Sequence, residues 1–134
     1  MRALVIDDSR AIRLILGQIL TALKIEVIEA GHGLEALEKL KEFGPLDLAL
    51  VDWNMPEMNG YEFVCEVRKD DQYKDMKLMM VTTETEMAQV IKALEAGANA
   101  YVMKPFTKDM LVEKLTIMGL EIDRTEPPTH LSTP

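Results

Sequence analysis

Hydrophobic residues along the chain fall into two alternating patterns. Five short segments with apolar centres have the length of a buried β-strand and are too short for a stable helix. They cover residues 3–6, 26–30, 48–51, 78–81 and 100–103. Each is followed by a longer segment whose apolar residues recur at spacings of three and four, the period of an amphipathic α-helix. Beyond residue 120 the pattern gives way to a segment rich in Pro and Thr.

Five strands that alternate with five helices predict a parallel sheet covered by helices on both faces. Right-handed crossovers leave few topologies for such a chain, and the flavodoxin-like strand order 2-1-3-4-5 is a common one at this length. We therefore predict an α/β, doubly wound domain over residues 1–120. Residues 121–134 are expected to form a flexible C-terminal tail or linker.

Composition and charge narrow the function classes. The chain has 134 residues, of which 48% are hydrophobic and 28% charged, as in a single soluble globular domain. Its net charge of -8, with no basic block, argues against a nucleic-acid partner. One cysteine allows no internal disulfide, and no apolar run resembles a signal peptide or a transmembrane span. We expect a cytoplasmic protein with no membrane partner.

Polar side chains stand where the predicted strands end. Asp7 and Asp8 follow the first strand, Asp52 ends the third, Thr82 ends the fourth and Lys104 follows the fifth. The carboxyl ends of parallel strands share one edge, and strands one and three are neighbours in the order 2-1-3-4-5. Three carboxylates should therefore meet in one crevice, at the edge where open α/β sheets bind ligands.

Three adjacent carboxylates repel one another, and a bound cation lowers that cost. All-oxygen ligands favour a hard ion such as Mg²⁺, with Mn²⁺ as an alternative. A carboxylate can also act as a nucleophile and form an aspartyl phosphate. Phosphoryl transfer then needs a metal, a cation and hydrogen-bond donors around the transferred group.

These requirements assign a role to each residue of the crevice. We predict that Asp52 accepts a phosphoryl group. Mg²⁺ is expected to bind Asp7, Asp8, Asp52 and the backbone carbonyl of Asn54. Lys104 is expected to neutralise the phosphoryl oxygens and Thr82 to donate a hydrogen bond to them.

With these residues the sequence resembles the receiver domains of bacterial two-component signalling, above all the single-domain response regulators of chemotaxis. The resemblance covers about residues 1–120, with every expected element in order. It rests on Asp7-Asp8, on Asp52 with the Met-Pro-Glu-Met-Asn-Gly turn at residues 55–60, on Thr82 and on Lys104-Pro105-Phe106. It implies the fold of those chemotaxis regulators, which is CheY-like.

The resemblance implies a switch rather than an enzyme that turns over a separate substrate. A sensor histidine kinase or a phosphotransfer protein would phosphorylate Asp52, in a reaction that the receiver itself catalyses, as it does its dephosphorylation. Thr82 would then move toward the phosphoryl group and Tyr101 would turn inward. The face made by the fourth helix, fifth strand and fifth helix would change its partner binding. The Lys104–Pro105 peptide bond is expected to be cis and to aim Lys104 into the crevice.

Three further positions are expected to tune the lifetime of the phosphoryl group. Thr83 is larger than the residue that relatives often carry after the switch threonine, so it would narrow access to Asp52. Asn54 and Glu84 each stand two residues past a site residue and resemble the pair found in chemotaxis regulators.

Other functions remain in view. An Mg²⁺-dependent phosphohydrolase would use the same aspartyl chemistry, but such enzymes usually carry a second acid where this chain has Asn54, and they have a cap domain. A flavin carrier would need a Ser-, Thr- and Gly-rich loop where Asp7 and Asp8 stand. A receiver that is never phosphorylated is disfavoured because the site residues are intact. The tail leaves open a receiver cut from a longer multidomain regulator, and the kinase, effector, pathway and any homodimer stay undetermined.

Overall fold

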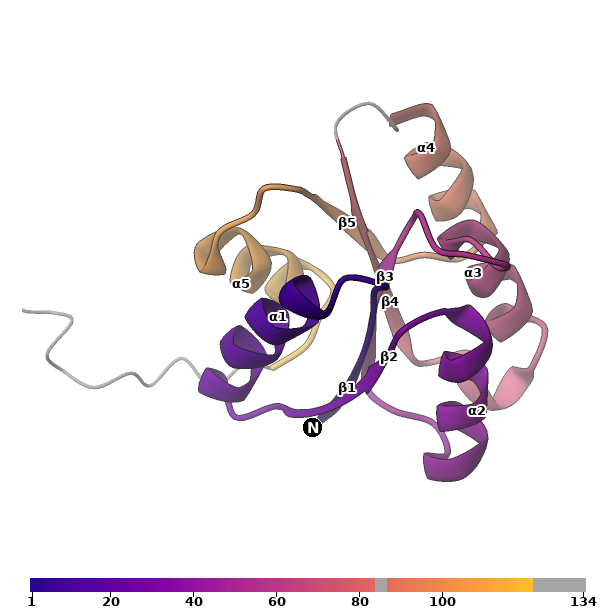
Figure 1. Ribbon diagram of the computed structural model, residues 1–134, viewed down its shortest axis with the longest axis horizontal. Helices are drawn as coiled ribbons and strands as arrows, with labels where there is room; N and C mark the ends of the chain where they lie inside the picture. The colour runs from indigo at the N-terminus through magenta and orange to yellow at the C-terminus, as the bar shows by residue number, and fades with distance from the viewer. Residues whose placement is uncertain (84–86, 122–134) are drawn as a thin grey trace, which may run out of the picture.

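The computed structural model describes residues 1–83 and 87–121 (Figure 1). Strands and helices alternate along the chain, as the hydrophobic pattern predicts. The elements are β1 (Arg2–Ile6), α1 (Arg10–Ala22), β2 (Glu26–Ala30), α2 (Gly33–Phe43), β3 (Leu48–Asp52), α3 (Gly60–Arg68), the short 3₁₀ helix η1 (Asp71–Tyr73), β4 (Lys77–Thr82), α4 (Met87–Ala96), β5 (Ala100–Met103) and α5 (Lys108–Ile117).

The five strands form one parallel sheet in the order β2-β1-β3-β4-β5. Helices α1 and α5 cover one face, and α2, α3 and α4 cover the other (Figure 1). This arrangement confirms the predicted fold and strand order. The strand bounds of β2 and β5 are the predicted ones, while the 3₁₀ helix η1 was not foreseen. Most of the predicted tail, residues 122–134, lies outside the described residues.

The continuous apolar runs are explained by helices on both sides of the sheet. In β1, Leu4 and Ile6 enter the core beneath α2 and α3, whereas Ala3 and Val5 enter the core beneath α1 and α5. All four are at most 1% exposed. Each of the central strands is therefore buried on both faces and holds its carboxyl end firmly at one edge of the sheet.

Four residues of the predicted helical patterns are less buried than the pattern suggests. Ile15 in α1, Leu34 in α2, and Ile91 and Leu94 in α4 are between 37% and 56% exposed. They flank the stripe that faces the sheet, because a helix buries only part of its circumference against one layer. None of the described helices is long and apolar enough to cross a membrane.

Helix caps fix the points at which the chain leaves the sheet. Ser9 caps α1, since its side chain accepts from the Ile12 amide at 3.2 Å. Asn59 and Glu62 form a reciprocal capping box at the start of α3. His32 caps α2 by accepting from the Glu35 amide.

Gly60 brings α3 back against the end of β3. Its amide donates to the Trp53 carbonyl at 2.9 Å. A Cβ at this position would lie 2.6 Å from the Asp52 carbonyl oxygen and 2.7 Å from the end of Met80. The residue that follows the Met55-to-Asn59 turn must therefore lack a side chain for Asp52 to keep its place.

We expect Gly60→Ala to lower the free energy of unfolding by about 1–3 kcal/mol, because the new methyl group is forced into backbone. Chemical denaturation measures the change. Gly17→Ala is the matched control, since a Cβ there would meet only Val27, at 4.0 Å, inside helix α1. That control should be neutral or stabilising by up to about 1 kcal/mol. Equal stability of the two variants would contradict the close approach at Gly60.

Candidate functional site

Asp52 is the last residue of β3, at the carboxyl edge of the sheet. The strand lies between β1 and β4, with Val51 opposite Ile6 and Asp52 opposite Val81. Asp52 is only 5% exposed. A polar residue thus stands at the end of a wholly buried strand, where its carboxylate is poorly hydrated.

Asp7 lies beside Asp52, and its amide, its carbonyl and its carboxylate all form hydrogen bonds. Its amide donates to the Ala30 carbonyl at 3.1 Å, and its own carbonyl accepts from Arg13 Nη1. Its Oδ1 accepts from the Ser9 amide at 2.8 Å. Asp7 is 1% exposed, whereas Asp8 next to it is exposed. The turn between β1 and α1 therefore presents one fixed and one solvent-facing carboxylate.

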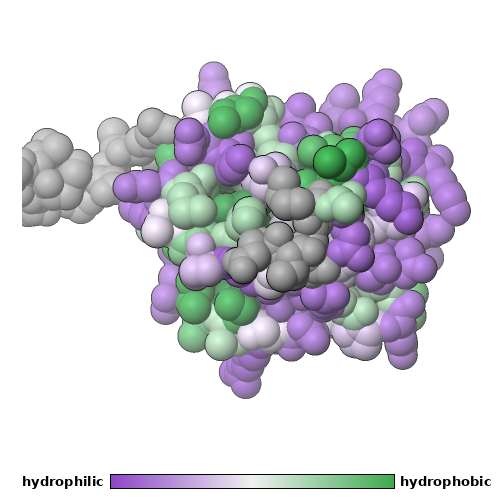
Figure 2. Space-filling model, turned by 90° about the horizontal axis from the view of Figure 1, so that it is seen from above, coloured by the Kyte–Doolittle hydropathy of each residue, from purple (hydrophilic) through white to green (hydrophobic). Residues whose placement is uncertain are grey.

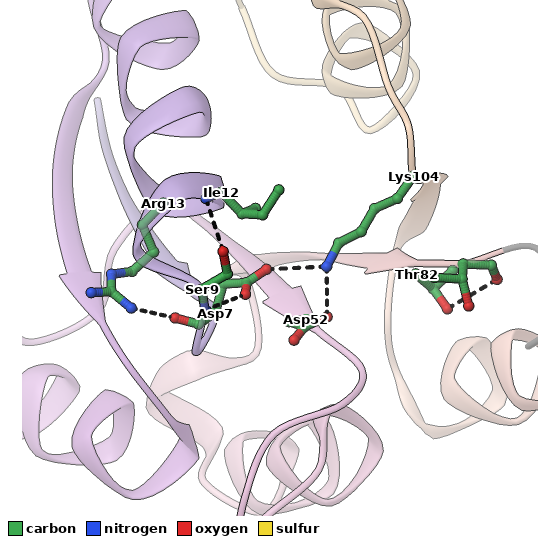
Figure 3. A network of polar contacts seen from close by, with 8 residues as sticks. Asp7, Ser9, Ile12, Arg13, Asp52, Thr82 and Lys104 are labelled. Atoms are coloured by element: carbon green, nitrogen blue, oxygen red, sulfur yellow. Dashed lines mark hydrogen bonds and ion pairs between the residues drawn. The ribbon is translucent and has the colours of Figure 1, made fainter.

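Lys104 joins the two buried carboxylates. Its Nζ lies 3.1 Å from Asp52 Oδ1 and 3.3 Å from Asp7 Oδ2, and Figure 3 shows the side chain reaching across from the end of β5. The Lys104 amide donates to the Thr82 carbonyl at 2.7 Å. The peptide bond between Lys104 and Pro105 is cis, as the resemblance implied.

The surroundings of the cluster raise the pKa of both Asp52 and Lys104. Burial, followed by the negative charge of Asp7, raises the pKa of Asp52 to about 6, although Lys104 partly offsets the rise. Burial alone would lower the pKa of Lys104, but Asp52 and Asp7 together raise it above its usual value. One ammonium group is therefore shared between two acids, and it leaves the cluster negatively charged.

The three acids fit a metal ion. One carboxylate oxygen from each of Asp7, Asp8 and Asp52 can be chosen so that all lie within 4.8 Å of one another. The donors are all oxygens, which suits a hard divalent cation. A divalent cation would also offset the negative charge of Asp7, which adds to the effect of burial on the pKa of Asp52.

The remaining predicted site residues surround this cluster less closely. Thr82 is buried, and its hydroxyl donates to the Thr83 carbonyl at 3.4 Å, on the side of Asp52 away from Asp7 (Figure 3). Tyr101 is half-buried, with Lys114 Nζ 4.7 Å from the centre of its ring. Asn54 and Thr83 are exposed, and Glu84 lies outside the described residues. The switch and tuning roles of these residues stay predictions, as does the metal contact of the Asn54 carbonyl.

Most of the chain matches one known protein family. The family model described as "Response regulator receiver domain" matches residues 3–116. The chain belongs to this family. The receiver domain is also similar to curated chemotaxis proteins of related length. It is 47% identical to the Helicobacter pylori chemotaxis protein CheY1 over 119 aligned residues, and these cover 88% of this chain and 96% of that protein.

Two further relatives agree with this result. The chemotaxis protein CheY homolog of Campylobacter jejuni is 49% identical to the receiver domain over 116 residues, 86% of this chain and 89% of that protein. Among solved structures, the chemotaxis response regulator CheY4 of Vibrio cholerae superposes with a TM-score of 0.80 at 36% identity, covering 87% of this chain and 97% of that one. Receiver domains of this kind generally bind Mg²⁺ and interact with histidine kinases and downstream effectors.

Sequence reasoning missed one residue that contacts the site of the receiver domain. Arg13 in α1 donates to the Asp7 carbonyl and pairs with Glu29 of β2. A charged residue on an amphipathic helix usually belongs to its solvated face. No spacing rule in the sequence distinguishes Arg13 from such a residue, so only the packed structure reveals its contact.

Proposed function

We propose that this receiver domain is a phosphorylation-dependent signalling switch whose acceptor is Asp52. The observation that carries the proposal is the position of the Asp52 carboxylate, buried at the carboxyl edge of the sheet, 3.1 Å from Lys104 Nζ and in one cluster with Asp7 and Asp8. A nucleophile, a positive charge and two further oxygen ligands are the groups that transfer of a phosphoryl group to a carboxylate requires.

In the proposed reaction, a carboxylate oxygen of Asp52 attacks the phosphorus of a phosphohistidine on a sensor kinase or phosphotransfer protein. The new P–O bond forms as the P–N bond breaks, and the imidazole nitrogen leaves with the electron pair. Lys104 neutralises negative charge on the phosphoryl oxygens as it develops. Asp7, Asp8 and Asp52, with the Asn54 carbonyl, would hold Mg²⁺, which when bound supplies further charge neutralisation.

The same groups support loss of the phosphoryl group to water, so that the receiver resets itself without acting on a separate substrate. Asn54, Thr83 and Glu84 are proposed to set the rate of this step.

The surface around the carboxyl edge of the sheet is mainly hydrophilic, with apolar side chains in separate patches (Figure 2). A polar rim suits a charged phosphodonor better than an apolar ligand.

The output surface is proposed to be the face formed by α4, β5 and α5. Exposed apolar side chains stand on its helices, with Ile91 and Ile117 56% and 67% exposed. Phosphorylation would draw Thr82 toward Asp52 and let Tyr101 turn inward from beneath Lys114. A downstream effector protein in the cytoplasm would bind the altered face.

Trp53 offers a direct test, because it is buried next to the acceptor and is the only tryptophan. We expect its fluorescence to change when Mg²⁺ is added together with acetyl phosphate or beryllofluoride. The Asp52→Asn variant should show no response to either phosphoryl reagent. A wild-type protein that responds to neither reagent in the presence of Mg²⁺, or a variant that responds equally, would rule out Asp52 as the acceptor.

A further inference from the structure

Arg13 connects three elements at the metal side of the site. From the first turns of α1 its Nη1 donates to the backbone carbonyl of Asp7, and its Nε pairs with Glu29 Oε1 of β2 at 2.9 Å. Figure 3 shows the guanidinium extended toward the backbone of Asp7, away from the carboxylate. Its side chain is 18% exposed, so both contacts are partly shielded from water.

The Arg13 contact completes the fixation of Asp7. The Asp7 amide already donates to Ala30 at the end of β2, and its Oδ1 accepts from the Ser9 amide. The main chain of α1 is anchored to the same turn, since the Arg13 amide donates to the Ser9 carbonyl at 3.0 Å. Arg13 is therefore the side chain that ties the carbonyl of Asp7, and with it the peptide leading to Asp8, to both α1 and β2.

We propose that Arg13 is a positioning residue for the metal-binding acids Asp7 and Asp8. The inference rests on the proposed function, because it assumes that these acids bind Mg²⁺. By fixing the peptide between them, Arg13 holds two carboxylates at the separation that one ion needs, although like charges drive them apart. Partners that orient metal ligands in this way typically contribute a factor of about 10–100 in affinity.

The charge of Arg13 and its positioning role predict opposite effects on Mg²⁺ affinity when the residue is removed. Arg13 is a positive charge beside a cation site, so its charge alone weakens Mg²⁺ binding. Removal of the charge should then tighten binding if Arg13 acts only through its field. If Arg13 positions the acids, its removal should weaken binding. A lysine at this position keeps the charge but loses the planar fork that reaches both Asp7 and Glu29.

Calorimetric titration of the phosphate-free protein with Mg²⁺ tests the proposal. We expect Arg13→Gln to raise the dissociation constant about tenfold. Arg13→Lys should raise it by a smaller factor, with its charge unchanged. Arg10→Gln removes the same charge from an exposed position at the start of α1 and should leave the constant unchanged or lower it. Denaturation of each variant without metal shows which of them are folded at the titration temperature.

The outcomes separate the inference from the function on which it rests. Weaker binding by Arg13→Gln and Arg13→Lys, together with no weakening by Arg10→Gln, supports the positioning role. If the wild type binds Mg²⁺ and the Arg13 variants bind it equally tightly or more tightly, the inference is overturned and the proposed function stays intact. If Arg13→Gln does not fold, Arg13→Lys alone decides, since its charge is that of the wild type. A wild-type protein that does not bind Mg²⁺ overturns both proposals.

Discussion

We expect Asp52→Asn to raise the free energy of unfolding of the metal-free protein at neutral pH by about 1–3 kcal/mol. Asp52 is 5% exposed, and its burial together with the charge of Asp7 raises its pKa from 3.8 to about 6. Ionised Asp52 is therefore a cost that the folded protein bears for its site. Asparagine has nearly the same shape and carries no charge, so the substitution removes that cost.

The effect should depend on pH in a defined direction. Between about pH 4 and pH 6 the folded state keeps a proton on Asp52 that the unfolded state has released, so the stability contributed by this group falls as the pH rises. Below about pH 4 the carboxyl group is neutral in both states and behaves much like asparagine. The stability difference between wild type and variant should therefore be small near pH 4 and reach its full size above about pH 6.

Urea denaturation across this pH range measures the difference. Glu38→Gln, which removes an exposed carboxylate from α2, controls for the change in net charge and should change stability by less than about 0.5 kcal/mol at any pH. Mg²⁺ should stabilise the wild type more than Asp52→Asn, because binding to the folded state raises its stability. If Asp52→Asn were less stable than the wild type at neutral pH, ionised Asp52 would not destabilise the folded protein.

We expect Arg68→Met to lower the free energy of unfolding by about 3 kcal/mol or more. Arg68 lies at the end of α3, on the side of the molecule away from Asp52, and every nitrogen of its guanidinium donates a hydrogen bond. The acceptors are the carbonyls of Gly97 (3.0 Å), Tyr73 (2.7 Å), Lys74 (3.3 Å) and Met76 (2.9 Å) and the side-chain oxygen of Asn99 (3.0 Å). Methionine would fill the space but donate none of these five hydrogen bonds. The Tyr73 carbonyl would keep only the bond from the Met76 amide, and Asn99 Oδ1 only the bond from the Leu78 amide.

Lys69→Met is the matched control for Arg68→Met. Lys69 follows Arg68 in the chain and carries the same charge, but its side chain is 70% exposed, and among the described residues its ion pair is with Glu66, across one helical turn. Its loss should cost less than about 1 kcal/mol. Arg68→Lys should also destabilise, because one ammonium group cannot reach acceptors from η1 and from the two loops that precede β4 and β5. The stabilities of the three variants are measured by thermal or urea unfolding. Equal stabilities would refute the role of Arg68.

The fold was predictable because strand and helix signals in this chain are strong and local. Strands buried on both faces read as short apolar runs, and β2 and β5 begin and end where the runs do. Contacts that depend on tertiary packing left no such signal. Arg68 stands in the polar run that ends α3 and reads as a surface charge, although it organises η1 and the turn before β5. The exposure of Ile15 and Ile91 likewise follows from how the helices lie on the sheet.

The proximity of Asp7, Asp52 and Lys104 was predictable for a related reason. In a parallel sheet, residues distant in sequence meet at one edge once the strand order is known, so the strand pattern alone places Asp7, Asp52 and Lys104 together. The structure adds distances and shows that Lys104 bridges both acids. The roles of Thr82 and Tyr101 depend on a change of state, which neither a residue pattern nor one conformation describes.

The central claim is that Asp52 is the phosphoryl acceptor, and locating the modified residue tests it most directly. After treatment with Mg²⁺ and acetyl phosphate, borohydride reduction converts an aspartyl phosphate to homoserine, which peptide mass spectrometry can place in the sequence. We predict homoserine at position 52 in the wild type, dependent on Mg²⁺, and none in Asp52→Asn. Homoserine at Asp7 or Asp8 with Asp52 unmodified, or no modified residue in a protein that binds Mg²⁺, would contradict the account.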